Sequence, residues 1–436
     1  MEINNKKIIN GWCMYDWANS VYSLVITSAI FPVYYDAVTT TKGNGDIVDF
    51  FGLQVVNSVL YSYSLSFSFL FVAAILPLLS GIADYSGKKK FFMKVFMYLG
   101  SFSCLGLYFF DGNSIEWGII CSVMASVGYS GSLVFYDAFL PEITSIDKFD
   151  KVSAKGYALG YVGSVILLVV NLAMILQYET FGFASEGDAT RFAFLMVGVW
   201  WMVFSQIPFM RLKDNVYNRK VEGNVLTEGY KELRKVYQSL KALKVMKLFL
   251  LAFFFYNMGV QTIMYLATLF GSKELKLESD QLILTILIIQ IVAVGGAFLF
   301  AYLSKIKGNK FSLQVMVLIW IGICLGAYFV YNAYEFYVLA LIVGMVMGGI
   351  QSLSRATFAK LIPEGSIDHA SFFSFYDVTY NVSIVVGTFS YGFIEQITGS
   401  MRNSALALML FFMVGMGFLL LAKIPLHTAF RKTPGN

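Results

Sequence analysis

The chain has 436 residues, of which 58% are hydrophobic and only 14% are Asp, Glu, Lys or Arg. A soluble domain usually has about 45–50% apolar and about 25% charged residues. The composition therefore excludes a soluble enzyme, a disordered chain and a nucleic-acid-binding protein. The net charge of +5 is too small to indicate an anionic partner. We expect a polytopic membrane protein whose first partner is the lipid bilayer.

Long apolar segments follow one another along the whole chain. About 20 helical residues cross a bilayer core of about 30 Å, so these segments predict twelve transmembrane helices. The expected ranges are 11–35, 54–80, 91–110, 115–140, 155–178, 191–210, 246–270, 281–303, 311–331, 335–361, 371–395 and 404–424. The runs are too long for barrel strands and lack their alternation, so the fold class is all-α integral membrane. The first run is too long for a signal peptide and is expected to remain as a span.

The placement of the basic residues predicts the orientation. If both termini are cytoplasmic, 26 of the 32 Lys and Arg residues fall in cytoplasmic segments and five in outer loops. The remaining one, Arg355, lies within a predicted span. Cytoplasmic loops of membrane proteins carry an excess of Lys and Arg, so we expect both termini to be cytoplasmic.

The longest interior connection divides the chain into two parts. We expect an N-terminal six-helix half at 1–210, a cytoplasmic linker at 211–245 and a C-terminal six-helix half at 246–436. Apolar residues recur in the linker at helical spacing, with basic residues on the other faces: Leu226, Tyr230, Leu233, Tyr237, Leu240 and Leu243. This pattern predicts an amphipathic helix that either lies on the anionic inner leaflet or binds a regulatory partner. A trace of internal repetition remains, because Leu-Pro-Glu at 140–142 and Ile-Pro-Glu at 362–364 follow the fourth and tenth spans.

The segment after the second span carries a loop signature. Residues 81–90 read GIADYSGKKK, which resembles the G-x-x-x-D-x-x-G-[RK]-[RK] loop of the major facilitator superfamily. Asp84 is an anion that can meet the N-terminus of a neighbouring helix, so we assign it a structural or gating role. Tyr85 stands where the superfamily often has Arg, and the matching loop at 305–310 (KIKGNK) lacks the Asp.

Three further segments are similar to the Unknown Major Facilitator family, which includes fungal vacuolar amino-acid effluxers and bacterial proteins of unassigned substrate. They are 12–35, which begins WCMYDWANS, 135–163, which begins FYDAFLPEIT, and 348–376, which begins GGIQSLSRATFAKLIPEG. Asp137 stands where that family would have Asn. The resemblance implies a twelve-helix facilitator fold in two pseudo-symmetric six-helix halves, and solute export or exchange.

Four ionisable residues fall inside predicted spans, where a charge costs at least about 2.5–3.5 kcal/mol. They are Asp16, Asp137, Arg355 and Asp377, and we expect them to act in gating or coupling. Asp16 either faces a central cavity or anchors the helix at the interface beside Trp12 and Trp17. Arg355 either extends to the inner surface or pairs with Asp137 or Asp377, and such a pair is a cytoplasmic gate or a permanent bridge. Asp377 is also a candidate for proton coupling.

Uncharged polar residues inside spans are candidates for substrate binding. These are Asn19, Asn257, Gln261, Gln290 and Asn381. The alternative for each is a hydrogen bond between neighbouring helices.

These features favour a secondary active transporter for a small solute, of which an amino acid or similar zwitterion is one example, working by alternating access in efflux or exchange. The alternative is a transport-inactive sensor or scaffold. Only two His and four Cys without metal-binding spacing are present, and the chain has no phosphate-binding loop. We therefore expect no enzyme activity, metal, nucleotide hydrolysis or cofactor beyond an ion or proton gradient. We expect a monomer in a plasma membrane, with a vacuolar membrane as the second choice.

Overall fold

The computed structural model describes residues 2–40, 45–219, 221 and 223–425. Helices dominate the described residues, as expected. The first segment is one continuous rod in three parts: α1 (Lys6–Val21), a π-helix (Tyr22–Ile30) and α2 (Phe31–Thr39). Pro32 lies in the first turn of α2. A proline ring clashes with the carbonyl one turn before it, and the wider π-turns ahead of Pro32 are consistent with that clash.

The remaining helices of the N-terminal part follow in chain order. They are α3 (Asn57–Ser86), α4 (Lys89–Leu107), α5 (Ile115–Asp137), the short α6 (Leu140–Ile143), a 3₁₀ turn (Ile146–Lys148), α7 (Phe149–Leu176) and α8 (Glu186–Arg211). We call α1 to α8 the first helix group.

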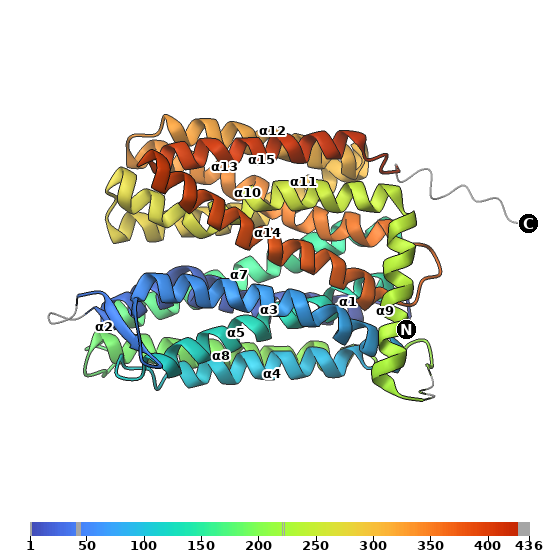
Figure 1. Ribbon diagram of the computed structural model, residues 1–436, viewed down its shortest axis with the longest axis horizontal. Helices are drawn as coiled ribbons and strands as arrows, with labels where there is room; N and C mark the ends of the chain where they lie inside the picture. Colours follow the sequence, from blue (N-terminus) through green and yellow to red (C-terminus); the bar gives the residue numbers. More distant parts are fainter. Residues whose placement is uncertain (1, 41–44, 220, 222, 426–436) are drawn as a thin grey trace, which may run out of the picture.

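The C-terminal part holds six long helices. They are α10 (Lys244–Leu275), α11 (Ser279–Lys307), α12 (Asn309–Tyr328), α13 (Ala333–Leu361), α14 (His369–Thr398) and α15 (Met401–Leu421). We call them the second helix group. The two groups lie one above the other in Figure 1, and α9 (Val225–Ala242) crosses their ends. We call this end of the molecule the α9 end.

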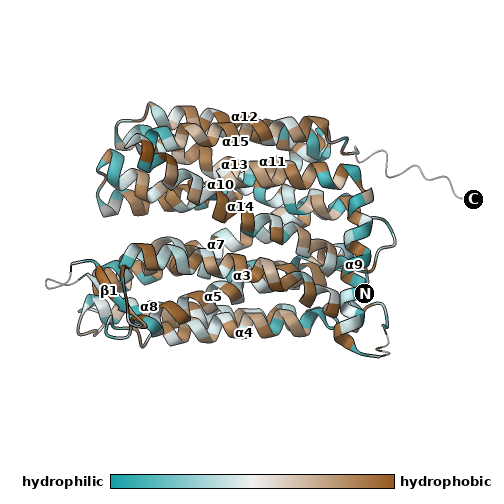
Figure 2. Cartoon of the chain, viewed as in Figure 1, coloured by the Kyte–Doolittle hydropathy of each residue, from teal (hydrophilic) through white to brown (hydrophobic). Residues whose placement is uncertain are grey.

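The polarity of the surface fits this arrangement. In Figure 2, hydrophobic residues cover the lengths of the helices, while hydrophilic residues gather at both ends and along α9. Eleven helices among the described residues are long and apolar enough to span a membrane. The prediction of the all-helical class is confirmed. The segment 371–395, predicted as a further span, lies in the 30-residue helix α14, which is not among these eleven.

A short hairpin was missing from the prediction. Strands β1 (Ile47–Phe50) and β2 (Leu53–Val56) pair antiparallel between α2 and α3. Phe51 and Gly52, which connect them, both have positive φ angles, of 50° and 82°, as tight hairpin turns require. The second span therefore begins at Asn57, three residues later than predicted.

The linker helix α9 forms as expected, but its buried face matches the expected apolar face only in part. Leu240 of that face is buried, whereas Leu226 and Tyr230 of the same face are exposed, and Gly229 and Val236, which lie outside it, are buried. A Cβ atom on Gly81 of α3 would lie 2.3 Å from the carbonyl oxygen of Gly229. The close approach of two glycines shows that α9 packs directly against α3.

Candidate functional site

Arg355 is the centre of a buried charge cluster that joins the two helix groups. It lies on α13 of the second group, and its side chain is 1% exposed. Its Nη1 lies 3.0 Å from Asp137 Oδ1, on α5, and its Nη2 lies 3.1 Å from Asp16 Oδ2, on α1. Arg355 Nε donates to Ser153 Oγ of α7 at 2.9 Å. Three helices of the first group thus bind one guanidinium of the second.

Aromatic rings complete the surroundings of this guanidinium. It lies 4.3 Å from the ring centre of Tyr157 and 4.8 Å from that of Trp12, within the range of cation–π attraction. Tyr136 donates its hydroxyl hydrogen to Asp16 Oδ2 at 2.8 Å. A Cβ atom on Gly156 would lie 2.3 Å from that same oxygen. Glycine at 156 therefore allows α7 to pass next to Asp16.

A central cavity adjoins the Arg355 cluster. It has a volume of about 1000 Å³, which includes space open to solvent, and both helix groups line it. Its lining residues on the first rod run from Asp16 to Ser28, with Asp16 nearer the α9 end. The charged lining residues are Asp16, Asp137, Arg355 and Asp377. All four ionisable residues singled out in the spans thus line one cavity.

Asp377 has a different position from the other two acids. Among the described residues, Arg355 forms ion pairs with Asp16 and Asp137 but none with Asp377. Asp377 is 5% exposed, and its Oδ2 atom is buried without a hydrogen-bond partner. Of the two expected partners of Arg355, the structure therefore shows Asp137, and it adds Asp16, which the sequence did not indicate as a partner. Asp16 is buried and lines the cavity, as the first of its two expected placements required.

The five uncharged candidates divide into two sets. Gln261 and Gln290 line the cavity, and Gln290 Oε1 is buried without a partner. Asn257 donates to Ser383 Oγ at 2.7 Å, and Asn381 donates to the Asp377 carbonyl at 2.8 Å. Together with Asn19, these two asparagines are buried but are not among the lining residues of this cavity. The bond from Asn257 of α10 to Ser383 of α14 is a hydrogen bond between neighbouring helices, which was the alternative expected for these residues.

Six tyrosines line the cavity and were not anticipated. They are Tyr129, Tyr157, Tyr161, Tyr265, Tyr376 and Tyr380. Two pairs among them, at 157 and 161 and at 376 and 380, are four residues apart on one helix. Residues at this spacing share a helix face, so the pattern was visible in the sequence.

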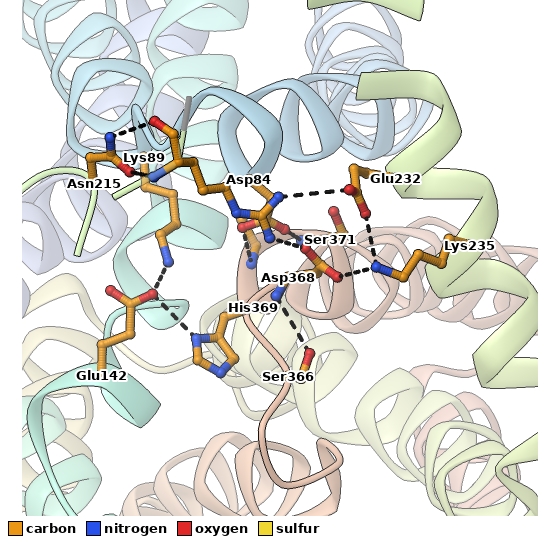
Figure 3. Close-up of polar contacts among 12 residues, drawn as sticks. Asp84, Lys89, Glu142, Asn215, Glu232, Lys235, Ser366, Asp368, His369 and Ser371 are labelled. Carbon is orange, nitrogen blue, oxygen red and sulfur yellow. Dashed lines mark hydrogen bonds and ion pairs between the residues drawn. The ribbon is translucent and has the colours of Figure 1, made fainter. Parts of the chain in front are cut away.

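Asp84 lies at the α9 end, outside the cavity. Its carboxylate accepts hydrogen bonds from the backbone N–H groups of Ala370, at 3.2 Å, and Ser371, at 2.6 Å. These are unpaired groups of the first turn of α14, where a negative charge is favourable. The expected contact between Asp84 and a neighbouring helix N-terminus is therefore present, and it links the two groups (Figure 3).

Further polar contacts surround this helix start, as Figure 3 shows. Glu142 pairs with Lys89 and lies 3.2 Å from His369 Nδ1. Arg219 of the linker pairs with Asp368, and Lys235 Nζ of α9 lies 3.5 Å from the same carboxylate. The Asp368 carboxylate raises the pKa of the Lys235 ammonium. The linker thus binds the second group at the residue that precedes α14.

Asp150 forms another contact between the two helix groups that the sequence analysis did not predict. Asp150, at the start of α7, accepts from Lys360 Nζ of α13 at 2.6 Å, from Ser304 Oγ of α11 at 2.8 Å and from Asn309 Nδ2 of α12 at 2.8 Å. The sequence gives little sign of it, because charged residues at span ends are ordinary. Among the described residues, the hydrogen bonds and ion pairs between the two groups gather toward the α9 end.

Comparison with known proteins agrees with this arrangement. The family described as "Vacuole effluxer Atg22 like" matches residues 4–426. The uncharacterized MFS-type transporter YxiO of Bacillus subtilis is 33% identical over 424 residues, which cover 96% of this chain and 95% of the relative. Autophagy-related protein 22 of Eremothecium gossypii is 25% identical, with 98% and 91% of the two chains covered.

A solved structure shows the same fold. The major facilitator superfamily transporter FucP, in its outward conformation, has a TM-score of 0.69 at 12% sequence identity, with 96% of this chain and 98% of FucP covered. The family match spans nearly the whole chain, and the resemblance drawn from the sequence is confirmed. This chain is therefore a membrane transporter of the major facilitator superfamily that belongs to the Atg22-like vacuole effluxer family.

Proposed function

We propose that this protein is a secondary active transporter that moves a small solute by alternating access. Residues 1–210 and 246–436 form two six-helix halves that rock about the central cavity, and residues 211–245 connect them. In this proposal α14 is also a membrane span, which brings the number of spans to twelve, and its polar residues face the other helices and the cavity. Transport is efflux or exchange, driven by an ion or proton gradient across the plasma membrane.

The ion pairs of Arg355 are the main support for this proposal. Arg355 of the second group binds Asp16 and Asp137 of the first group, directly beside the cavity that both groups line. Opening the α9 end must separate these residues, and closing it brings them together. The cluster therefore acts as a gate rather than as a permanent bridge.

The orientation follows from the charges. The linker 211–245 and the other basic segments lie on the side that the excess of Lys and Arg assigns to the cytoplasm. Both termini are then cytoplasmic, and the α9 end is the inner end. The contacts at this end support an outward-facing state with the inner gate closed.

Transport by the purified protein tests the proposal. The protein is first screened for thermal stabilisation by a panel of amino acids, amines, peptides and sugars. Stabilising solutes are then measured by counterflow in proteoliposomes. Counterflow of at least one solute above protein-free vesicles is expected, with loss of flux in Arg355→Met. Stabilisation without any counterflow would instead support a sensor or scaffold.

A further inference from the structure

The cavity contains more carboxylates than its cation can balance. Asp16 and Asp137 both contact Arg355, and Asp377 adds a third acid to the lining. Among the described residues, Arg355 is the one Lys or Arg that lines this cavity. A bound molecule therefore meets an excess of negative groups.

Arg355 is also already occupied. Its Nη1, Nη2 and Nε atoms all donate, to Asp137, Asp16 and Ser153 at 2.9–3.1 Å. A carboxylate or phosphate on a solute would have to compete with Asp16 and Asp137 for the guanidinium. In this closed state the cavity has no free cation for an anionic group.

Hydrogen-bond acceptors, in contrast, are free. Asp377 Oδ2 and Gln290 Oε1 are buried without partners, and both residues are more than nine-tenths buried in the cavity wall. An unsatisfied acceptor in a buried site is unfavourable until a donor arrives. An ammonium group brings three donors and one positive charge.

The tyrosine rings favour the same kind of group. Tyr376 and Tyr380 are on α14 with Asp377, at i−1 and i+3, and Tyr265 lines the cavity from α10. The face of a tyrosine ring attracts cations. The ring of Tyr376 stacks on that of Phe253, with 4.3 Å between the ring centres, so this part of the cavity wall is held in place.

From these observations we infer that the cavity binds solutes through a protonated amine, with Asp377 as the counter-ion. This inference rests on the proposed transport function and narrows its substrate class. The ammonium group provides the recognition, and a carboxylate on the same solute contributes little. Amines without a carboxylate should therefore bind at least as well as the parent amino acids.

Two sets of probes separate the chemical groups. Tyramine, tyrosine and 3-(4-hydroxyphenyl)propionate share the same phenol. Tyramine carries only an ammonium group, the propionate carries only a carboxylate, and tyrosine carries both. Butylamine, norvaline and pentanoate repeat the comparison on an alkyl chain. Binding is measured by thermal stabilisation and calorimetry of the full-length protein in lipid nanodiscs, with NaCl held constant.

The wild-type protein is expected to bind the amine and the amino acid of at least one set, and to bind the carboxylate at least about tenfold more weakly. Asp377→Asn, which keeps the shape of the side chain, should weaken amine binding by about tenfold or more, the equivalent of one ion pair. Asp111→Asn, which removes the same charge from an exposed loop, should leave it unchanged.

Equal or tighter binding of the carboxylates, or no binding of any amine, would overturn the inference. So would amine binding that Asp377→Asn does not weaken in a variant that folds with wild-type stability. These results are independent of the proposed function. Counterflow of an anionic or neutral solute would still support the proposed transport function. Amine binding without counterflow would still support the amine site.

Discussion

Loss of the Arg355 charge should open the α9 end of the protein. In Arg355→Met the side chain keeps most of its volume, but Asp16 and Asp137 lose the cation that both contact. Removal of one partner from a buried ion pair costs about 3–5 kcal/mol. The cost falls mainly on the closed state, because opening this end brings water to the two acids.

The size of this effect is enough to reverse the conformational preference. About 5.5 kcal/mol converts a ratio of closed to open state of about 99:1 into 1:99. Roughly half of that energy makes the two states equally populated. A penalty of about 3–5 kcal/mol on the closed state therefore makes the open state the major one, even where the wild-type protein is closed about 99% of the time.

Spin-label distances measure the change directly. Lys151 at the start of α7 and Lys305 near the end of α11 are exposed and belong to different helix groups. Cysteine labels at these positions should show a short distance in the wild-type background and a longer one in Arg355→Met. Arg402→Met, which removes an arginine at the opposite end, should keep the short distance.

A triple variant tests the physical reason. Asp16→Asn and Asp137→Asn added to Arg355→Met remove all three charges, so no buried charge lacks a partner, and the short distance should return. A wild-type distance in Arg355→Met, or a triple variant as open as the single one, would show that unpaired buried acids do not open this end.

Three further predictions concern the contacts around this cluster. Gly156→Ala places a methyl group against a buried carboxylate and should lower stability by about 1–3 kcal/mol, whereas Gly322→Ala, with open space around it, should leave the melting temperature nearly unchanged. Asp84→Asn removes the negative charge at the start of α14 and should destabilise the closed state by about 1 kcal/mol. The spin-label distances should then shift toward the open state, and an unchanged distribution would contradict the role of this acid. Asp368→Asn should return the raised pKa of Lys235 toward its ordinary value and speed hydrogen exchange in α9, and unchanged exchange would show that the linker is held by other contacts.

The buried charges were the part of the site that the sequence predicted well. Asp16, Asp137, Arg355 and Asp377 stand out because an ionisable residue in an apolar run is rare and expensive. Their partners were predicted only in part: Asp137 was one of two expected partners of Arg355, whereas Asp16 was not expected. Whether Arg355 meets Asp16 or Asp377 depends on the rotation and crossing of α1, α13 and α14, and the sequence of one helix does not specify its orientation relative to the others.

Other features were missed for identifiable reasons. Asp150 and Lys360 lie at span ends, where charged residues are ordinary, so their contact across the two groups left no local signal. The hairpin at 47–56 is apolar and runs directly into α3, so hydropathy alone merged part of it with the span. Asn257 and Asn381 share the polarity of Gln261, but only the structure shows which of them face the cavity.

A reversible cross-link at the α9 end tests whether this end must open during each transport cycle. Ala154 of α7 packs in a small buried cluster with Ala297 and Ala301 of α11. Ala154→Cys combined with Ala297→Cys or Ala301→Cys allows a disulfide between the two helix groups without removing a polar contact. Flux of a transported solute in proteoliposomes is measured before oxidation, after it and after reduction.

Flux is expected to stop when the cross-link forms and to return when it is reduced. The single-cysteine variants should be unaffected by the same oxidant. Full flux from protein that is completely cross-linked would show that transport does not require this end to open.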